Sequence, residues 1–543
     1  MKIKEKIRQN KKVILLVLLV IIIIGGFLRT YHYHDWLDFG RIQARDAWAT
    51  QDAILNHKPL PLLGPRASGT DFKLGPAFYY MQYLSARIFG TAPDKVAYPD
   101  LFFSILTIPL LFFFLKKYFN NTTALALTAL YAVSYTAVQS GRFAWNPNSL
   151  PFFSILFLYA FLKFSDSDCK HKLGWAIIAG VALGIGAQLH TLYLIIFPIV
   201  FVVFSAYLIR QKILKFRYVA AVILVAFALN IPQIISEVRT GGRNAAAFME
   251  GVGSKPKGSD SLVSKIFLDI GWHFQANAML LTPFGNGGVS EYSHLLKDLR
   301  SKKWMRKIQD NSSEYAVLAS GAVFSIAGYV LLAYFLKKES DEKKKKFLQL
   351  IALLATITFF VFIPLASDVQ LKYFYILAFV PFLLLGLIIK FVSERYGRAA
   401  SLILLTLVAV LCLINIYGVK NNFNVLAGIG NGEKNLLGEE VFAANFIKVH
   451  TNGSQPVYLL GEKKSFRGNV WALQYLLNSR VVYMLSDRNI PQGKVMLNAT
   501  YFSFFSRNKS DEVKAPTRTE LGNYRISDRA SYGPYIIVKL EKQ

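Results

Sequence analysis

Eleven apolar blocks constrain this chain more than any other feature of its sequence. An apolar stretch of about 18 residues is long enough to cross a bilayer as a helix, and in lipid the backbone must satisfy its own hydrogen bonds. Charged residues make up only 17% of the 543, against about 25% in soluble domains. We therefore predict an α-helical polytopic membrane protein with about eleven transmembrane helices. Their cores, none of which contains Asp, Glu, Lys or Arg, are 13–28, 101–115, 124–139, 149–162, 173–189, 192–209, 218–235, 315–336, 347–365, 373–389 and 399–417.

The distribution of Lys and Arg predicts the orientation of these helices. If the N-terminus is cytoplasmic, the inner segments carry 24 positive residues, while the short outer loops carry only Arg142 and Lys372. Positive residues gather in the cytoplasmic loops of membrane proteins, and a missed or extra span would destroy this contrast. The sequence thus predicts a multi-pass protein of the plasma membrane with a cytoplasmic N-terminus and an extracytoplasmic C-terminus.

Three long segments fall on the outer side under this topology. We predict a transmembrane domain over 1–417 with outer loops at 29–100 and 236–314, followed by a small extracytoplasmic α/β domain over 418–543. In the first loop, 46–56 and 76–89 are expected to be short helices. In the C-terminal domain, the pattern predicts a helix at 441–449 and strands at 457–460, 481–485 and 535–540.

The net charge of +29 raises the question of nucleic acid. Because many of the positive residues stand in short loops between apolar blocks, we expect them to set topology and to meet anionic head groups or a phosphate-bearing substrate. Membrane lipids are the predicted partner, and nucleic acid is not.

Polar residues are densest near the membrane in the first outer loop. A carboxylate held there could act as a general base for an acceptor hydroxyl, and a neighbouring arginine could bind a phosphate leaving group. A solvated loop with a helix N-cap would explain the same residues without any catalysis. The cluster consists of Asp35, Asp38, Arg41, Gln43, Arg45, Asp46 and Asp52.

Three stretches of sequence resemble one family. The segment 42–80, IQARDAWATQDAILNHKPLPLLGPRASGTDFKLGPAFYY, looks like the first outer loop of bacterial C-type membrane glycosyltransferases, in the group with a dolichyl-phosphate-mannose protein mannosyltransferase-like domain. FAWNPNSLPFF at 143–153 is a second match, and AQLHTLYL at 187–194 is a third. The resemblance implies a C-type glycosyltransferase fold, with an active site between the first outer loop and the membrane surface. It also implies transfer of a sugar from a polyprenyl-phosphate carrier to an acceptor.

The chain departs from the family pattern at two places. The acidic residue that the family carries before the motif glutamine is Ile42 here, and the positive residue or His that often precedes its Gly-Pro pair is Leu74, with Lys73 one place away. Asp46, inside the QARDA motif, is therefore our first choice as the catalytic base. Asp38 is the second choice, because it could reach the same place from the preceding segment.

Further residues are expected to bind substrate. Arg45 matches the motif arginine and could hold the carrier phosphate, although a salt bridge to a neighbouring Asp would explain it equally well. Trp145 and Asn146 could face the sugar, although the turn-forming sequence around them needs no such role. The predicted binding set is Gln43, Arg45, Lys73, Trp145, Asn146, Arg239 and Arg243.

The sequence predicts an inverting membrane glycosyltransferase whose acceptor is a glycan, a lipid or a protein. An envelope polymer ligase is a related alternative. A flippase or transporter of lipid-linked sugars is a rival of another class, but transporters usually carry ionisable residues within their spans or inverted repeats, and neither is visible here. A non-catalytic glycan-binding membrane protein is a third reading. No cofactor is expected, and we predict no metal site, since His32, His34 and Asp35 lack a convincing further ligand.

Overall fold

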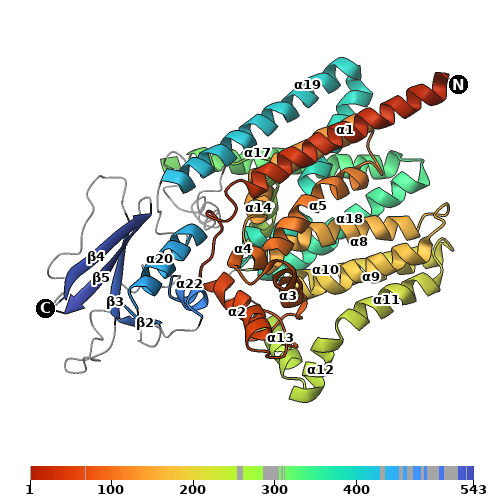
Figure 1. The fold of residues 1–543 in the computed structure, drawn as a ribbon. Helices are drawn as coiled ribbons and strands as arrows, with labels where there is room; N and C mark the ends of the chain where they lie inside the picture. Colours follow the sequence, from red (N-terminus) through yellow and green to blue (C-terminus); the bar gives the residue numbers. More distant parts are fainter. Residues whose placement is uncertain are drawn as a thin grey trace.

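A computed structural model provides the structure of the protein (Figure 1). It describes residues 2–67, 69–253, 261–284, 305–306, 310, 312–428, 435–451, 457–460, 469–478, 482–485, 500–506, 524–532 and 535–542.

All eleven predicted blocks are helical. Among the described residues, eight helices are long and apolar enough to cross a membrane, and two bent pairs could each form one more span. The third block, 124–139, is divided by Ser134 into two helices of 13 and 6 residues. The helices of these blocks are α1 (Lys2–Thr30), α5 (Tyr98–Leu115), α6 (Asn121–Val133), α7 (Tyr135–Ser140), α8 (Leu150–Phe164), α9 (Lys172–Leu189), α10 (Thr191–Arg210), α11 (Phe216–Leu229) bent into α12 (Ile231–Thr240), α17 (Ser312–Lys338), α18 (Glu342–Phe362), and η3 (Leu371–Leu377) bent into α19 (Val380–Gly428).

α19 is in fact two helices joined at Gly397. The backbone of Gly397 has φ 81°, a left-handed conformation that glycine adopts without a steric penalty. In Figure 1 its second half lies on the same side of the helical body as α1, and Phe423 in this half is packed against Tyr31 at the end of α1, with ring centres 5.4 Å apart. This half continues to Gly428, so the last span passes the predicted boundary at residue 417 without interruption.

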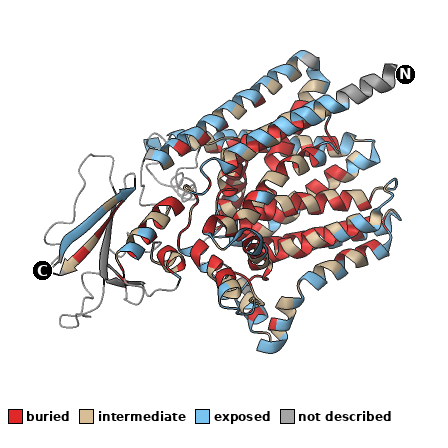
Figure 2. Ribbon diagram, viewed as in Figure 1, coloured by how far each residue is buried: buried red, intermediate tan, exposed pale blue. Residues whose placement is uncertain are grey.

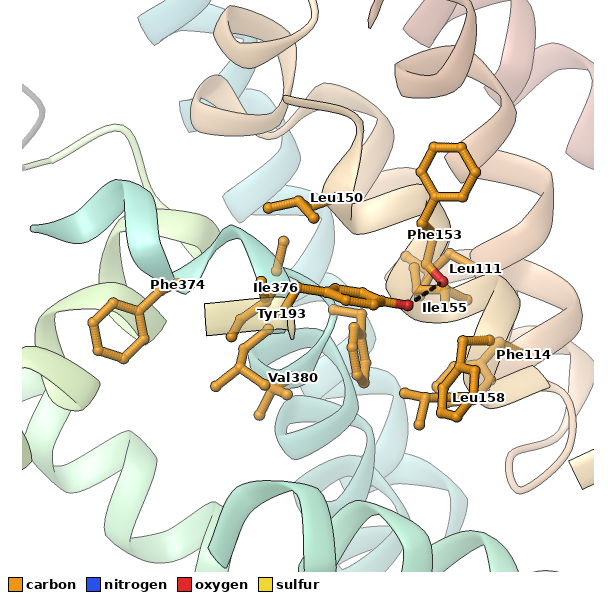
Figure 3. Packing of buried hydrophobic residues seen from close by; sticks show 14 of the residues in the cluster. Leu111, Phe114, Leu150, Phe153, Ile155, Leu158, Tyr193, Phe374, Ile376 and Val380 are labelled. Carbon is orange, nitrogen blue, oxygen red and sulfur yellow. Dashed lines mark hydrogen bonds between the residues drawn. The ribbon is translucent and has the colours of Figure 1, made fainter. Parts of the chain in front are cut away.

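The core lies among the central helices, which are buried on most of their surface, whereas α1, α11 and the second half of α19 remain largely exposed (Figure 2). Such exposed apolar surface is what lipid would cover. Figure 3 shows the packing where α5, α8, α10 and the start of α19 meet. There the Tyr193 hydroxyl donates to the Phe153 carbonyl at 3.4 Å, so this buried hydroxyl has a hydrogen-bond partner.

The first outer loop folds into short helices, as predicted: α2 (Arg41–Leu55), α3 (Ala77–Phe89) and α4 (Pro93–Val96). The second outer segment forms α13 (Arg243–Gly253) and α14 (Leu262–Leu281). α14 was not expected from the sequence. It is packed against α17 and α19 and is buried over most of its second half.

The C-terminal part is a five-stranded sheet with two helices. The strands are β1 (Val457–Leu460), β2 (Val482–Leu485), β3 (Thr500–Ser506), β4 (Tyr524–Tyr532) and β5 (Tyr535–Lys542), in the order β2-β1-β3-β5-β4. β1 pairs in parallel with β2 and β3, and β5 pairs antiparallel with β3 and β4. The helices α20 (Leu437–Val449) and α22 (Asn469–Leu476) lie between the sheet and the helical body (Figure 1).

The C-terminal part is docked on the first outer loop. Residues 35–39 pair with 435–438 through backbone bonds, including Phe39 N to Asn435 O at 2.8 Å and Leu437 N to Leu37 O at 2.8 Å. The Tyr475 hydroxyl of α22 donates to the Thr91 carbonyl at 2.6 Å. The two regions that frame the predicted site are thus held together by directed bonds.

Candidate active site

Asp46 lies on the buried face of α2, against α3. Its side chain is 1% exposed, and Oδ1 accepts from Arg45 Nε at 2.9 Å and from the Tyr79 hydroxyl at 3.1 Å. Oδ2 is buried without a hydrogen-bond partner among the described residues. Burial raises the pKa of this carboxyl above its ordinary value, although Arg45 opposes the shift. Asp46 therefore has the predicted arginine beside it but no opening toward a substrate in this conformation.

The other first-loop candidates are spread around α2. Asp38 is half-buried, and its backbone pairs with Leu436 of the C-terminal part. Gln43 is buried on α2, and Ile42 beside it is exposed. Lys73 has an exposed side chain, but its backbone is clamped by Asn244 of α13, which accepts from Lys73 N at 2.7 Å and donates to Lys73 O at 2.9 Å. Their predicted roles in catalysis and binding stay predictions.

The segment 143–149 forms a tight turn, as its Asn and Pro residues predict. Asp100, at the start of α5, holds the turn by accepting from Trp145 N at 3.0 Å and from Ser149 Oγ at 2.6 Å. The side-chain amide of Asn146 is buried and donates to the Leu189 carbonyl at 2.6 Å. Asn146 thus joins the turn to the end of α9, and the Trp145 ring is left partly exposed.

A cavity of about 300 Å³ opens beside this ring. It lies between the turn, the second half of α14 and η3, and most of its walls are apolar. Its lining comprises Thr136, Phe143, Trp145, Ala276, Met279, Leu280, Leu371, Lys372, Phe374 and Tyr375. Ligand pockets are typically of this kind, mostly apolar with a few placed polar groups.

Lys372 is the charged residue of this lining. Its Nζ lies 5.2 Å from the centre of the Trp145 ring and 5.7 Å from that of Tyr373. Within the part of the chain that the structure describes, no carboxylate forms an ion pair with it. A half-buried ammonium beside aromatic rings and without an acidic partner is suited to an anionic ligand.

Arg142 and Lys372, the two positive residues of the predicted short outer loops, have different roles in the structure. Arg142 is 3% exposed and donates to the carbonyls of Leu28, Arg29 and Tyr31 at 3.2, 3.0 and 2.8 Å, so it caps the end of α1. Burial lowers its pKa to about 10, which leaves it charged at neutral pH. Lys372 faces the cavity instead. Sequence reasoning missed Lys372 as a site residue, although its presence in a positive-poor outer loop was a usable signal.

Arg239 and Arg243 are both exposed, at the end of α12 and the start of α13. They flank Gly241 and Gly242, which have φ 64° and 81° and make the turn between these helices. Neither arginine lines the cavity. Their predicted contact with substrate stays a prediction.

Within the described ranges, no three His, Cys, Asp or Glu side chains form a group that could hold a metal ion. The expectation that the protein works without a metal or cofactor stays a prediction.

Part of the chain matches a family of known proteins. Residues 73–235, from within the first outer loop just before α3 to the middle of α12, match the family model of dolichyl-phosphate-mannose-protein mannosyltransferase. The predicted family resemblance is confirmed. No curated protein sequence matches the chain.

Solved structures show the same fold. The oligosaccharyltransferase of Archaeoglobus fulgidus, in its apo form, aligns over 91% of this chain and 69% of its own, with a TM-score of 0.52 and 14% identity. AglB from the same organism, solved with an inhibitory peptide and a dolichol-phosphate, aligns over 87% of this chain and 64% of its own, with a TM-score of 0.51 and 13% identity. ArnT from Cupriavidus metallidurans aligns over 98% of both chains at 14% identity, with a TM-score of 0.48. The alignments to the two Archaeoglobus fulgidus structures confirm the predicted C-type glycosyltransferase fold of a multi-pass membrane protein.

Proposed function

We propose that this protein transfers a sugar from a polyprenyl-phosphate carrier to an acceptor hydroxyl at the outer face of the membrane, with inversion at the anomeric carbon. The observation that carries the proposal is Lys372 in its mostly apolar cavity beside Trp145. A lipid-linked sugar needs an apolar surface for the isoprenoid chain and a cation for the phosphate. The cavity combines the two.

The reaction places particular demands on this cation. When the acceptor oxygen attacks the anomeric carbon, the bond from that carbon to the phosphate oxygen breaks, and negative charge grows on the departing phosphate. A preformed positive group at that point lowers the barrier, because it interacts more strongly with the transition state than with the ground state. Lys372 is suited to this role, and the Trp145 ring offers an apolar face to the sugar.

The match to the mannosyltransferase family model supports the reaction class, and it covers Thr136, Phe143 and Trp145 of the cavity lining. The dolichol-phosphate solved with AglB supports the class of donor. The sugar and the acceptor are left open between a glycan, a lipid and a protein.

The proposal can be tested with the full chain in nanodiscs of defined lipid. Binding of undecaprenyl phosphate should displace a radiolabelled polyprenyl-phosphate sugar, and Lys372→Met should weaken this binding about 10- to 100-fold, the loss expected for one charge-assisted contact. Lys337→Met is the matched control, because Lys337 lies in the last turn of α17 and does not line the cavity. This variant should bind the donor as the wild type does.

Two outcomes would contradict the proposal. Equal binding by the wild type and Lys372→Met would remove the cavity from the donor site. Protein-dependent movement of the labelled lipid between leaflets, without transfer to any acceptor in an envelope extract, would favour a flippase.

A further inference from the structure

α14 carries a buried acid and a buried base one turn apart. Asp269 and His273 are 0% and 9% exposed at their side chains, and His273 Nε2 lies 3.9 Å from Asp269 Oδ1. Both oxygens of Asp269 and the Nε2 atom lack a hydrogen-bond partner among the described residues. Buried polar atoms are almost always paired, so three unpaired atoms in one place call for an explanation.

This pair lies next to the cavity. Residues three and four apart share a helix face, which puts Asp269 and His273 in one line with Ala276 and Leu280. Ala276 and Leu280 belong to the cavity lining. Phe374 of η3 also belongs to it, and its ring is packed edge-on against the His273 imidazole, with the ring centres 4.9 Å apart. One aromatic side chain therefore contacts both the imidazole and the cavity.

The connection to the proposed phosphate site is short. Lys372 stands two residues before Phe374 in η3, and both side chains line the cavity. Other elements also surround the pair. The rings of Phe359 and Phe362 on α18 each have their centre 6.0 Å from that of the His273 imidazole, and Tyr329 of α17 lies near Asp269. Lys265, one turn earlier on α14, donates a hydrogen bond to the Pro364 carbonyl. Among the described residues, Asp269 is the acidic group that lies within ion-pair distance of the imidazole.

We propose that His273 is the general base of the transfer reaction and that Asp269 orients it. This assignment rests on the proposed function. Nε2 faces the carboxylate, which leaves Nδ1 to accept the proton of the acceptor hydroxyl. A carboxylate behind an imidazole fixes its tautomer and stabilises the imidazolium that forms. The 3.9 Å separation is long for a hydrogen bond, as catalytic pairs without substrate often are.

The acceptor O–H bond breaks and its proton moves to His273 Nδ1, while the oxygen's electron pair forms the bond to the anomeric carbon. The bond from that carbon to the phosphate oxygen breaks, and its electron pair leaves with the polyprenyl phosphate, whose charge Lys372 meets. The imidazolium then returns its proton to solvent. The Phe374 side chain has to turn aside for the acceptor to reach the imidazole.

The first outer loop offers a less suitable base in this structure. Oδ1 of Asp46 accepts hydrogen bonds from Arg45 and Tyr79, and Oδ2 is buried away from solvent. Like His273, neither Asp46 nor Asp38 belongs to the cavity lining, but the His273 imidazole packs directly against the lining residue Phe374. The family's usual acid in this loop is replaced by Ile42, so a base from another element would supply what the loop lacks.

The test compares His273→Gln, His273→Gly and Asp269→Asn with His171→Gln as the control, using the full chain in nanodiscs and a labelled polyprenyl-phosphate sugar. His171 is exposed at the start of α9, far along that helix from the site. We expect His273→Gln to lower kcat by about 10²- to 10⁴-fold, as removal of a general base does. Donor binding should stay within about threefold of wild type, because Lys372 is untouched. Free imidazole should restore part of the activity of His273→Gly, and Asp269→Asn should lower kcat with little change in KM.

The outcomes separate this assignment from the proposed function. Wild-type protein that binds donor but never transfers sugar would contradict the proposed function. Active wild type together with an active His273→Gln would overturn only the base assignment. An inactive His273→Gly that binds donor normally, yet gains nothing from imidazole, would mean that His273 has a packing role and would also overturn it.

Discussion

Replacing Arg142 should destabilise the protein without weakening its hold on the donor. Arg142 is buried at the outer end of α1, where the last carbonyls of a helix have no partner within it. Its guanidinium supplies three donors to Leu28, Arg29 and Tyr31, and it stands 4.9 Å from the centre of the Phe423 ring on α19. One side chain therefore ties α1 to the turn after α7 and to the last span.

The magnitude follows from these contacts. Arg142→Met keeps the volume but removes every donor. Breaking such a buried, charged network costs about 3–5 kcal/mol when the groups left behind stay buried. Tyr31 and Leu28 are at least partly exposed, so water can replace part of the loss, and we expect about 2–4 kcal/mol. Arg142→Lys keeps the charge but not the fork of donors, and it should recover less than half of this.

Reversible unfolding in a mixed-micelle denaturant titration would measure the change, with donor binding followed on the same samples. Lys372→Met is the natural contrast, because it removes the other positive residue of the short outer loops. We expect Arg142→Met to lower stability with donor affinity retained, and Lys372→Met to do the reverse. If Arg142→Met unfolds at the wild-type midpoint, the capping role deduced here is wrong.

Three further predictions concern the first loop, the C-terminal part and the topology. Asp46→Asn should reduce transfer less than His273→Gln does; a loss of about 10² in rate with donor binding intact, assayed beside Asp38→Asn, would instead support Asp46 as the base. Burial raises the pKa of Glu439 on α20 from 4.5 to about 7, so the folded protein holds a proton there that the unfolded chain releases. Stability should then fall as pH rises from about 4.5 to about 7, and Glu439→Gln should flatten that fall in thermal melts at pH 5 and pH 8; an unchanged slope would contradict it. A phosphatase fused after Gln543 should be active in intact cells, and a fluorescent but phosphatase-silent fusion would reverse the predicted orientation.

The membrane helices could be predicted from the sequence because lipid makes a local demand. Each block has to pair its own backbone and present apolar side chains, and both conditions are met within the block itself. The predicted helices and strands of the outer regions also appear in the structure, such as α3 at Ala77–Phe89 and β5 at Tyr535–Lys542, because their hydrophobic patterns are local features of the sequence too. α14 was missed because Asp269, His273 and Gln275 make it too polar for a span, yet its neighbours bury it.

The candidate site was only half visible in the sequence. The QARDA motif does place Arg45 beside Asp46, and these two are adjacent residues whose pairing needs little from the rest of the fold. Trp145 was singled out as well. Lys372 was counted only as an exception to the positive-inside pattern, because nothing local distinguishes a loop lysine that faces a cavity from one that faces water.

The amino-acid sequence by itself determined the membrane spans, their predicted orientation and the family resemblance, since these depend on the length, charge and order of segments that act locally. Only the tertiary structure decided which polar groups meet. The packing of α2 against α3 buries Asp46. The same tertiary structure brings Trp145, Lys372 and α14 to one cavity, although Trp145 and Lys372 are more than two hundred residues apart in the sequence. The physical reason is that a buried charge takes its properties from the elements packed around it, and that packing is set by the whole chain.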